Sequence, residues 1–316
     1  MKYFVGVDIG GTNSKIGVLN SEGDILKSVS IKTESIEGVD YTLNKIWQTV
    51  LEITDELDIS SDLICGIGMG IPGPVIDQKK VGFFANFPWE KNINISEKME
   101  KISGVKTRLD NDVNVIALGE TLYGAGKGFS KSVTIALGTG VGGGIFIDGK
   151  LISGANGAGG EIGHMKLEKD GKLCGCGQKG CFETYASATG VIREALSRLQ
   201  INKNNGLYQA INGDLNKLEA KHVFDEAKKG DKFSLDIVDY ISEYLAMGIG
   251  NVLNIINPEV IILCGGVALA GDILLDKVKE KLPNYALAIT IEGLEIKLGE
   301  LGNDAGIKGA SALTIN

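Results

Sequence analysis

The sequence predicts an α/β fold that contains two copies of one strand–turn–strand unit. Residues 3–26 alternate apolar and polar positions on both sides of a Gly-Thr bend, which predicts a strand, a turn, a strand, a polar turn and a strand. Residues 132–152 repeat this order, again with Gly-Thr at the first bend. One such hairpin is common, but two of them predict a duplicated α/β lobe with a cleft between the copies.

The segments between the two copies alternate between helical and extended patterns. Apolar residues recur at helical spacing in residues 41–57, and residues 63–74 are typical of a buried strand that enters a Gly/Pro loop. Residues 105–126 predict a strand, a polar corner and a helix. This alternation is the pattern of an α/β lobe.

The last third of the chain follows the same alternation. Residues 233–259 predict a long helix that ends near Asn257-Pro258, and VIILC follows as a buried strand. The segment DAGIKGASAL predicts a helix that returns to the first lobe. We therefore expect a small N-terminal lobe of residues 1–116 plus 303–316, and a larger C-terminal lobe of residues 117–302.

Composition and charge narrow the possible partners. The chain has 316 residues and a net charge of −8, and an acidic surface repels a phosphate backbone, so nucleic acid is a poor candidate. No apolar stretch reaches the roughly 20 residues of a membrane span, and Asp8 interrupts the apolar N-terminus too early for a signal peptide. We expect a cytoplasmic protein with no membrane contact, in which thiols stay reduced.

The two glycine-rich turns, Gly10–Ser14 and Gly138–Gly144, are candidate phosphate sites. Glycine has no Cβ and lets backbone N–H groups approach phosphate oxygens. The second turn matches G-x-G-x-x-G but leads into a strand, which is the wrong context for a dinucleotide fold, and no G-K-[ST] of a Walker loop is present. The alternative is that both are hairpin turns that need a positive φ.

Three polar residues, Asp110, Asn111 and Asp112, fall where a predicted strand feeds a helix. Such a corner is usually an N-cap, but an Asp there could also act as a general base that takes a proton from a substrate hydroxyl. Asn111 could exchange hydrogen bonds with neighbouring hydroxyls. Asp8 ends a strand beside the first glycine turn, where it could hold Mg²⁺ through water or serve only as a turn carboxylate.

Three cysteines crowd the stretch CGCGQKGC, and one of the two histidines precedes it. His164, Cys174, Cys176 and Cys181 form the pattern H-x9-C-x-C-x4-C, a four-ligand set for tetrahedral Zn²⁺. The C-x-C spacing is not that of a common zinc finger, so free thiols in a glycine-rich loop are the alternative. The remaining two, Cys65 and Cys264, lie in apolar runs and are expected in the core.

Two carboxylates bracket the cysteine stretch, Glu161 in GEIGH and Glu183 in GCFET. Carboxylates fixed by a metal loop can orient a polyol through paired hydrogen bonds to adjacent hydroxyls. Taken alone, they are more simply explained as surface glutamates.

Beyond these separate motifs, the chain resembles the ROK family of sugar kinases, within the larger actin, Hsp70 and hexokinase-like ATPase superfamily. It is most similar to the ATP-dependent bacterial glucokinases of that family. The segments that carry the resemblance are DIGGTNSKIGVLN, GIPGPV, NFPW, LDNDVNVIALGE, LGTGVGGGIFIDGKLISGANGAGGEIGHM, CGCGQKGCFETYASATG, ILCGGVALAG and DAGIKGA. The resemblance implies an α/β, two-lobed fold of duplicated ribonuclease H-like domains, with a zinc-containing loop.

The resemblance also implies roles for individual residues. Asp112 would be the catalytic base that activates the primary hydroxyl of the sugar. The sugar-binding set would be Asn111, Asp112, Glu161, His164 and Glu183, with Asn86 and Gly73 near the ring. The nucleotide set would be Gly10, Gly11, Thr12, Asn13, Gly138, Thr139 and Gly140 for phosphate, Gly265 and Gly266 for adenosine, and Asp8 for Mg²⁺. His164, Cys174, Cys176 and Cys181 match the ligands of a structural Zn²⁺.

The implied activity is ATP-dependent phosphorylation of a hexose, glucose to glucose 6-phosphate, by two lobes that close and exclude water. Rival kinases act on N-acetylmannosamine, N-acetylglucosamine or fructose, and polyphosphate could replace ATP. A sugar-sensing regulator is the non-enzymatic rival, although the first phosphate strand begins at Tyr3, so we expect no DNA-reading module. A homodimer or homotetramer is expected from the family.

Overall fold

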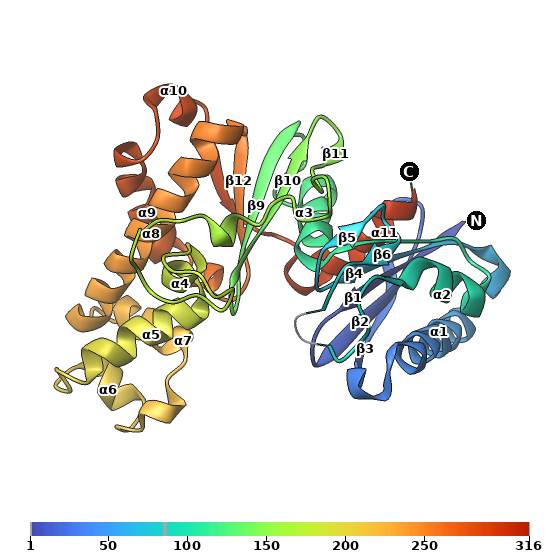
Figure 1. Cartoon of the computed structure of the whole chain (residues 1–316), viewed down its shortest axis with the longest axis horizontal. Coiled ribbons are helices and arrows are strands. Elements are labelled where there is room, and N and C mark those ends of the chain that lie inside the picture. The colour runs from blue at the N-terminus through green and yellow to red at the C-terminus, as the bar shows by residue number, and fades with distance from the viewer. Residues whose placement is uncertain (1, 85–86, 316) are drawn as a thin grey trace. The chain divides into compact units, whose positions relative to one another are not determined.

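The computed structural model describes residues 2–84 and 87–315, and the chain forms two compact units (Figure 1). Unit 1 contains Met1–Thr134, Gly144–Gly160 and Gly299–Asn316. Unit 2 contains Ile135–Gly143 and Glu161–Leu298. The predicted lobes, 1–116 with 303–316 and 117–302, are a different division of the chain and stay a prediction about which segments act together.

A five-stranded sheet in the order β3-β2-β1-β4-β8 forms the centre of unit 1. The antiparallel strands are β1 (Tyr3–Ile9), β2 (Asn13–Leu19) and β3 (Ile25–Lys32). The strands β4 (Ile64–Ile71) and β8 (Thr107–Asn111) continue the sheet in parallel with β1. The strand–turn–strand prediction for residues 3–26 is confirmed.

One face of this sheet carries large apolar side chains. Val5 and Val7 of β1 are fully buried, and they share a core with α1 (Val39–Glu56) and α2 (Ile95–Ser103). Side chains alternate along a strand, so each odd position of β1 faces this core. Figure 1 shows α1 and α2 together beside the sheet.

The other face of the sheet is lined by glycines instead. Gly6, Gly66 and Gly68 lie against α11 (Ala305–Ile315), and a Cβ at Gly68 would overlap the carbonyl oxygen of Ala310. This glycine surface allows the helix backbone to approach the strands. The segment predicted to return to the first lobe as a helix does so as α11, which also packs along α3 (Asp112–Tyr123).

A buried carboxylate in α3 fixes the segment that re-enters unit 1. Glu120 is 1% exposed, and its Oε2 accepts hydrogen bonds from the backbone N–H groups of Ala125 and Glu300, both at 3.1 Å. Its Oε1 accepts from the N–H of Leu301 at 2.9 Å. One side chain therefore joins the segment that follows α3 to the segment that precedes α11.

The second sheet has the order β11-β10-β9-β12-β13, which repeats the strand order of the first. Its strands are β9 (Lys131–Leu137), β10 (Val141–Ile147), β11 (Lys150–Leu151), β12 (Val260–Cys264) and β13 (Glu295–Leu298). This confirms the predicted repeat at residues 132–152 and the duplicated fold. A third, three-stranded sheet in unit 1 consists of β5 (Val75–Ile76), β6 (Lys80–Val81) and β7 (Ile93–Asn94).

Helices make up most of unit 2. The helices are α4 (Glu183–Ala186), α5 (Ala188–Leu199), α6 (Gly206–Ala210), α7 (Ala220–Lys228), α8 (Lys232–Ile256), α9 (Asp272–Lys281) and α10 (Ala288–Ile291). As predicted, α8 ends at Asn257, which adopts the left-handed conformation and donates its N–H to Leu253. Short 3-10 helices are η1 (Ser35–Glu37), η2 (Ser61–Leu63), η3 (Ile162–His164), η4 (Leu215–Lys217), η5 (Ala268–Ala270), η6 (Leu282–Asn284) and η7 (Gly302–Asp304).

The prediction that Cys65 lies in the core is wrong, because its side chain is exposed. The pairing register between β1 and β4 shifts at this point: Tyr3 pairs with Ile64 and Phe4 with Gly66, so Cys65 is an extra residue. A bulged residue leaves the regular alternation of the strand. Cys264 is only half-buried. Within residues 2–84 and 87–315, no helix has both the length and the apolar character that crossing a bilayer requires.

Candidate functional site

The polar corner between β8 and α3 is the first half of the candidate site. Asn111 caps α3, since its Oδ1 accepts the backbone N–H of Val113 at 2.9 Å. Its Nδ2 donates to the carbonyl oxygen of Gly73 at 3.2 Å. Asn111 therefore has the capping role and also connects the corner to the Gly73 loop.

Asp112 is the first residue of α3, and its side chain is partly exposed. Its Oδ1 accepts the N–H of Val113 at 3.0 Å. Burial raises the pKa of this carboxyl above its usual range, and hydrogen bonds from Val113 and Asn111 only partly oppose that effect. A partly buried carboxylate with a raised pKa, next to solvent, has the properties of a general base.

Asp110 lies behind the corner and is 2% exposed. Its Oδ1 accepts the backbone N–H of Asn111 at 2.8 Å and the Nδ2 of Asn114 at 2.7 Å, and the Ser153 side chain also hydrogen-bonds to the carboxylate. Burial raises the pKa of Asp110, and these hydrogen bonds work against that shift. The sequence did not predict that Asn114 and Ser153 contact the Asp110 carboxylate. The only indication in the sequence was an Asn in the first turn of a predicted helix.

The first glycine turn joins β1 to β2. It is closed by a hydrogen bond from Gly10 N–H to the Asn13 carbonyl at 3.0 Å, and the Thr33 N–H donates to the Thr12 carbonyl at 3.0 Å. Gly11 has no atom within 4 Å of the position its Cβ would take, and its φ is not in the left-handed region.

Asp8 ends β1 next to this turn, and Gly306 of α11 packs against its carboxyl group. Burial raises the pKa of Asp8, the nearby Lys15 lowers it, and the charge of Asp112 raises it further. Asp8 and Asp112 are therefore close enough to influence each other's ionisation. Carboxylate oxygens are suitable Mg²⁺ ligands.

The second glycine turn, between β9 and β10 in unit 2, has the same character. Gly138 donates its N–H to the Gly140 carbonyl at 3.0 Å, and the Oγ1 of Thr189 donates to the Thr139 carbonyl at 2.8 Å. Gly138, like Gly11, has neither a left-handed φ nor a neighbour within 4 Å of its Cβ position. The hairpin-turn alternative therefore does not account for these two glycines, and the space that a side chain would fill is open to a ligand.

A third glycine pair lies beside the second turn. Gly265 follows β12 with φ of 88°, and a Cβ there would be 2.6 Å from the Leu137 carbonyl oxygen. The N–H of Val267 donates to that same carbonyl at 3.1 Å. Gly266 is exposed, with nothing within 4 Å of its Cβ position. The predicted adenosine loop thus adjoins the Gly138 turn within unit 2.

The predicted metal ligands come together in unit 2. One ligand atom each from His164, Cys174, Cys176 and Cys181 lies within 4.8 Å of all the others. The sulfur atoms of Cys176 and Cys181 are 3.7 Å apart. Two thiolates bound at about 2.3 Å to one tetrahedral Zn²⁺ would be about 3.8 Å apart, so the four residues are compatible with zinc.

Lys166 belongs to this cluster, although sequence analysis did not single it out. Its Nζ donates to the sulfur of Cys181 at 2.8 Å. Backbone bridges between Lys166 and Cys181 and between Leu173 and Lys179 hold the loop. Its position two residues after His164 was the only sequence signal.

The carboxylates of Glu161 and Glu183 lie on the two sides of His164. Nε2 of the imidazole is 3.8 Å from Glu161 Oε2, and Nδ1 is 3.9 Å from Glu183 Oε1. The Cys174 thiol donates to Glu183 Oε1 at 2.7 Å, and a Cβ at Gly140 would be 2.6 Å from Glu183 Oε2. Unit 2 therefore brings both glutamates, the histidine, the cysteines and the second glycine turn into one region.

Gly73 and Asn86 are the two residues that were predicted to lie near the sugar ring. Gly73 has φ of 122°, and a Cβ there would overlap the carbonyl oxygen of Phe83, so this position requires glycine for the fold as well. Asn86 lies outside the described residues.

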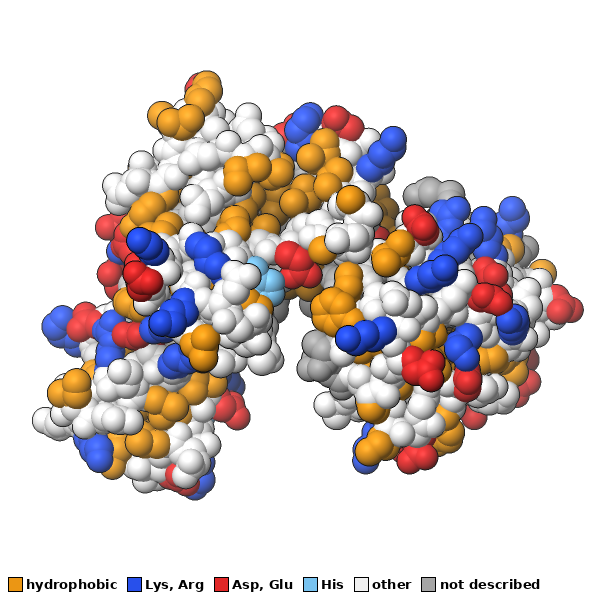
Figure 2. Space-filling model, viewed as in Figure 1, with side chains coloured by type: hydrophobic (Ala, Val, Ile, Leu, Met, Phe, Trp, Pro, Cys, Tyr) orange, Lys and Arg blue, Asp and Glu red, His pale blue; other side chains and the backbone are white. Residues whose placement is uncertain are grey.

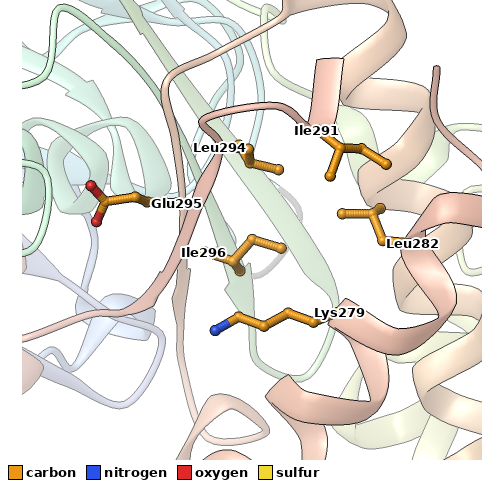
Figure 3. A pocket seen from close by; sticks show the side chains of 6 residues that line it. All are labelled: Lys279, Leu282, Ile291, Leu294, Glu295 and Ile296. Carbon is orange, nitrogen blue, oxygen red and sulfur yellow. The ribbon is translucent and has the colours of Figure 1, made fainter. Parts of the chain in front are cut away.

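One further cavity does not coincide with the predicted residues. Figure 3 shows a cavity of about 290 Å³ in unit 2, where Leu282, Ile291, Leu294 and Ile296 converge and Lys279 lies at one side. Its lining has no group of carboxylates, thiols or imidazoles. On the visible face in Figure 2, basic and acidic side chains are interspersed within each unit.

Comparisons with known proteins agree with this geometry. The sequence model described as ROK family matches residues 4–316. A glucokinase of Thermotoga maritima is 37% identical over 311 residues, which are 98% of this chain and 96% of the relative. A glucokinase of Halalkalibacterium halodurans is 39% identical over 316 residues, which are 99% of this chain and 94% of the relative.

A solved structure is similar over the same length. The crystal structure of a ROK family glucokinase from Streptomyces griseus, in complex with glucose and AMPPNP, superposes with a TM-score of 0.83. It is 31% identical in sequence and covers 99% of this chain and 99% of its own.

Proposed function

The chain belongs to the ROK family, and from this premise we propose that it transfers the terminal phosphoryl group of ATP to the primary hydroxyl of glucose, which gives glucose 6-phosphate. The observation that carries the proposal is the Asp112 carboxylate, partly buried with a raised pKa at the start of α3, in a chain similar to glucokinases over nearly its whole length.

In this proposal Asp112 accepts the proton of the primary hydroxyl as the oxygen attacks phosphorus. Loss of that proton makes the hydroxyl a better nucleophile as phosphoryl transfer proceeds. The remaining sugar hydroxyls are bound by Asn111, Glu161, His164 and Glu183, with Gly73 and Asn86 near the ring. His164 fits this assignment because its Nδ1 faces the cysteines while Nε2 is turned toward Glu161.

The glycine turns would bind the nucleotide. Backbone N–H groups in the turns Gly10–Asn13 and Gly138–Gly140 are proposed to donate hydrogen bonds to phosphate oxygens, and Gly265 and Gly266 are proposed to contact adenosine. The open space at Gly11 and Gly138 supports the phosphate assignment, because neither glycine is needed for the local fold. Donors aimed at the transferring phosphoryl group stabilise its charge.

Two metals complete the proposal. Asp8 would hold Mg²⁺, whose charge neutralises phosphate oxygens when it is bound. The residues His164, Cys174, Cys176 and Cys181 would hold a structural Zn²⁺ that shapes the loop carrying Glu183. Four protein ligands complete a tetrahedral site, which is typical of structural zinc. A cytoplasmic location, a role in glycolysis and a homodimeric or homotetrameric assembly also remain proposals.

A coupled assay of ADP release on a panel of sugars tests the proposed function. Turnover should be strongest with glucose, and weaker with N-acetylmannosamine, N-acetylglucosamine and fructose. Parallel reactions with polyphosphate identify the donor. Sugar binding without ADP release would contradict the proposal and favour the sugar-sensing regulator.

A further inference from the structure

A buried polar group behind the catalytic corner has no role in the proposed chemistry. It consists of Asp110, Asn114 and Ser153, which we call the corner clamp. Asp110 and Asn114 are each 2% exposed, so neither is placed to touch a sugar or a nucleotide. Burying a carboxylate and an amide costs free energy, because both groups lose their hydrogen bonds to water. Hydrogen bonds within the protein must compensate for that loss, so a buried polar group of this kind calls for an explanation.

The hydrogen bonds of the clamp surround the backbone of Asp112. Asp110 precedes Asp112 by two residues and Asn114 follows it by two. The 2.7 Å hydrogen bond from Asn114 Nδ2 to Asp110 Oδ1 therefore joins the end of β8 to the first turn of α3 across the residue proposed as the base. The same oxygen also accepts the Asn111 N–H at 2.8 Å, which fixes the peptide that leads into Asp112.

Asn114 is not explained by stability alone. Asn has a low helix propensity, and the Oδ1 of Asn114 has no hydrogen-bond partner among the described residues although it is buried. An apolar side chain of similar size would remove that unpaired acceptor. Only the Nδ2 group is used, and it is directed at Asp110.

Ser153 extends the clamp to a distant part of unit 1. It follows β11 and begins the loop that continues through Gly157, where a Cβ would overlap the carbonyl oxygen of Val75. A cavity of about 180 Å³ lies beside Ser153, and its lining includes Asp77, Gln78 and Asp110. Ser153 therefore connects Asp110 to the loop that follows β11. The cavity lies next to this connection, so Asp77 and Gln78 do not fill the space around it.

We propose that the corner clamp positions the Asp112 carboxylate for proton transfer, so that Asp110, Asn114 and Ser153 are positioning residues of the phosphoryl transfer. The inference rests on the proposed function, because it takes Asp112 as the base. A displacement of about 1 Å at a reacting group can cost about a hundredfold in rate, which is the scale on which such a clamp acts.

The test compares Asn114→Leu and Ser153→Ala with the wild-type chain in glucose-dependent ADP release. We expect Asn114→Leu to lower kcat about tenfold to a hundredfold, with the KM for glucose and for ATP changed less than about threefold. Its melting temperature should fall, because the buried Asp110 carboxylate loses a donor; a stability loss alone does not lower kcat of the folded protein at unchanged KM. Ser153→Ala should lower kcat by a smaller factor and will serve as the decisive variant if Asn114→Leu does not fold.

Two further variants separate positioning from a structural role. Thr134→Val is the matched control, because Thr134 Oγ1 is the other buried side-chain atom without a partner in the described part of the chain. It should leave kcat unchanged. In an Asp112→Asn background, Asn114→Leu should reduce the residual rate less than about twofold, because the clamp acts through the carboxylate.

The double exchange Asp110→Asn with Asn114→Asp restores a hydrogen bond of reversed direction. It should recover part of the kcat that each single exchange loses. Equal losses from Asn114→Leu with and without Asp112, or a wild-type kcat in both Asn114→Leu and Ser153→Ala, would overturn the inference. A wild-type chain without sugar-dependent ADP release would instead refute the proposed function, so the two failures are distinguishable.

Discussion

The polar corner of unit 1, which contains the proposed base Asp112, and the cysteine cluster of unit 2 are held together in different ways. At the corner, the buried Asp110 carboxylate accepts hydrogen bonds from the protein, and Asn111 is fixed by capping α3. In the cluster, His164 and Cys176 are exposed, and four ligand atoms converge within 4.8 Å of one another. The corner is thus ordered by hydrogen bonds of the fold, whereas the cluster brings four potential metal ligands together in one loop.

This difference predicts which changes each region tolerates. A change of charge at Asp112 should alter the rate of proton transfer, while the hydrogen bonds of Asp110 and Asn111 keep the backbone of the corner in place. A lost metal ligand in the cluster alters the loop itself and the glutamate attached to it, because Glu183 follows Cys181 by two residues at the start of α4. The following predictions test this contrast, beginning with the largest effect.

Asp112→Asn should lower kcat about 10²- to 10⁴-fold in the ADP-release assay, because the amide cannot accept a proton. Its thermal stability should not fall. The raised pKa means that the folded chain binds this proton more tightly than the unfolded chain, so ionisation of Asp112 destabilises the fold as pH rises through its pKa. Near-normal turnover in this variant would refute the assignment of the base.

Cys176→Ser should reduce bound zinc from about one per chain and lower kcat/KM for glucose about 10- to 100-fold, since ligand loss disorders the loop that carries Glu183. Metal analysis and kinetics on protein purified without chelator measure both effects. The matched control is Cys65→Ser, because Cys65 is also exposed but lies at the β4 bulge in unit 1. Wild-type protein without zinc would contradict the metal assignment.

Glycines of the two units offer a sharper version of the contrast. Gly11→Ala and Gly138→Ala should raise the KM for ATP about tenfold, because a Cβ would occupy space kept for phosphate, while the melting temperature holds. Gly68→Ala should instead prevent stable folding, because its Cβ would overlap the Ala310 carbonyl. Unchanged ATP affinity in both turn variants would leave those glycines without a ligand role.

The smallest expected effect is the position of the acid limb of the pH profile. Burial raises the pKa of Asp112, so the unprotonated base is lost as pH falls through a value above the usual value of about 3.9 for Asp. Asp8 shares this region and also has a raised pKa, with Lys15 opposing the shift. A kcat/KM profile that declines only below the ordinary Asp range would contradict the raised pKa of Asp112.

Much of the fold could be predicted from sequence because its strands and helices have clear periods. The alternation of Val5, Val7 and Ile9 predicted β1, and the Asn257-Pro258 pair predicted the end of α8. The bulge at Cys65 could not be predicted, because a one-residue shift in pairing depends on the neighbouring strand and not on the local pattern.

The site was predictable only where its residues are close in sequence. The cysteine spacing predicted the four residues that the structure brings together, and the polar corner predicted the proposed base Asp112. The hydrogen bond between Ser153 and Asp110 joins residues 43 positions apart (153 − 110 = 43), and Glu120 accepts from Glu300 and Leu301. No local pattern reports such contacts, because the backbone donors and the serine hydroxyl are common throughout the chain.

The most direct measurement is a crystal structure of the chain with glucose and a non-hydrolysable ATP analogue bound. If the Asp112 carboxylate activates the sugar, one of its oxygens will lie about 2.6–3.2 Å from the primary hydroxyl oxygen. A bound sugar whose primary hydroxyl is more than about 4 Å from that carboxylate, with another group in hydrogen-bond contact instead, would contradict the account.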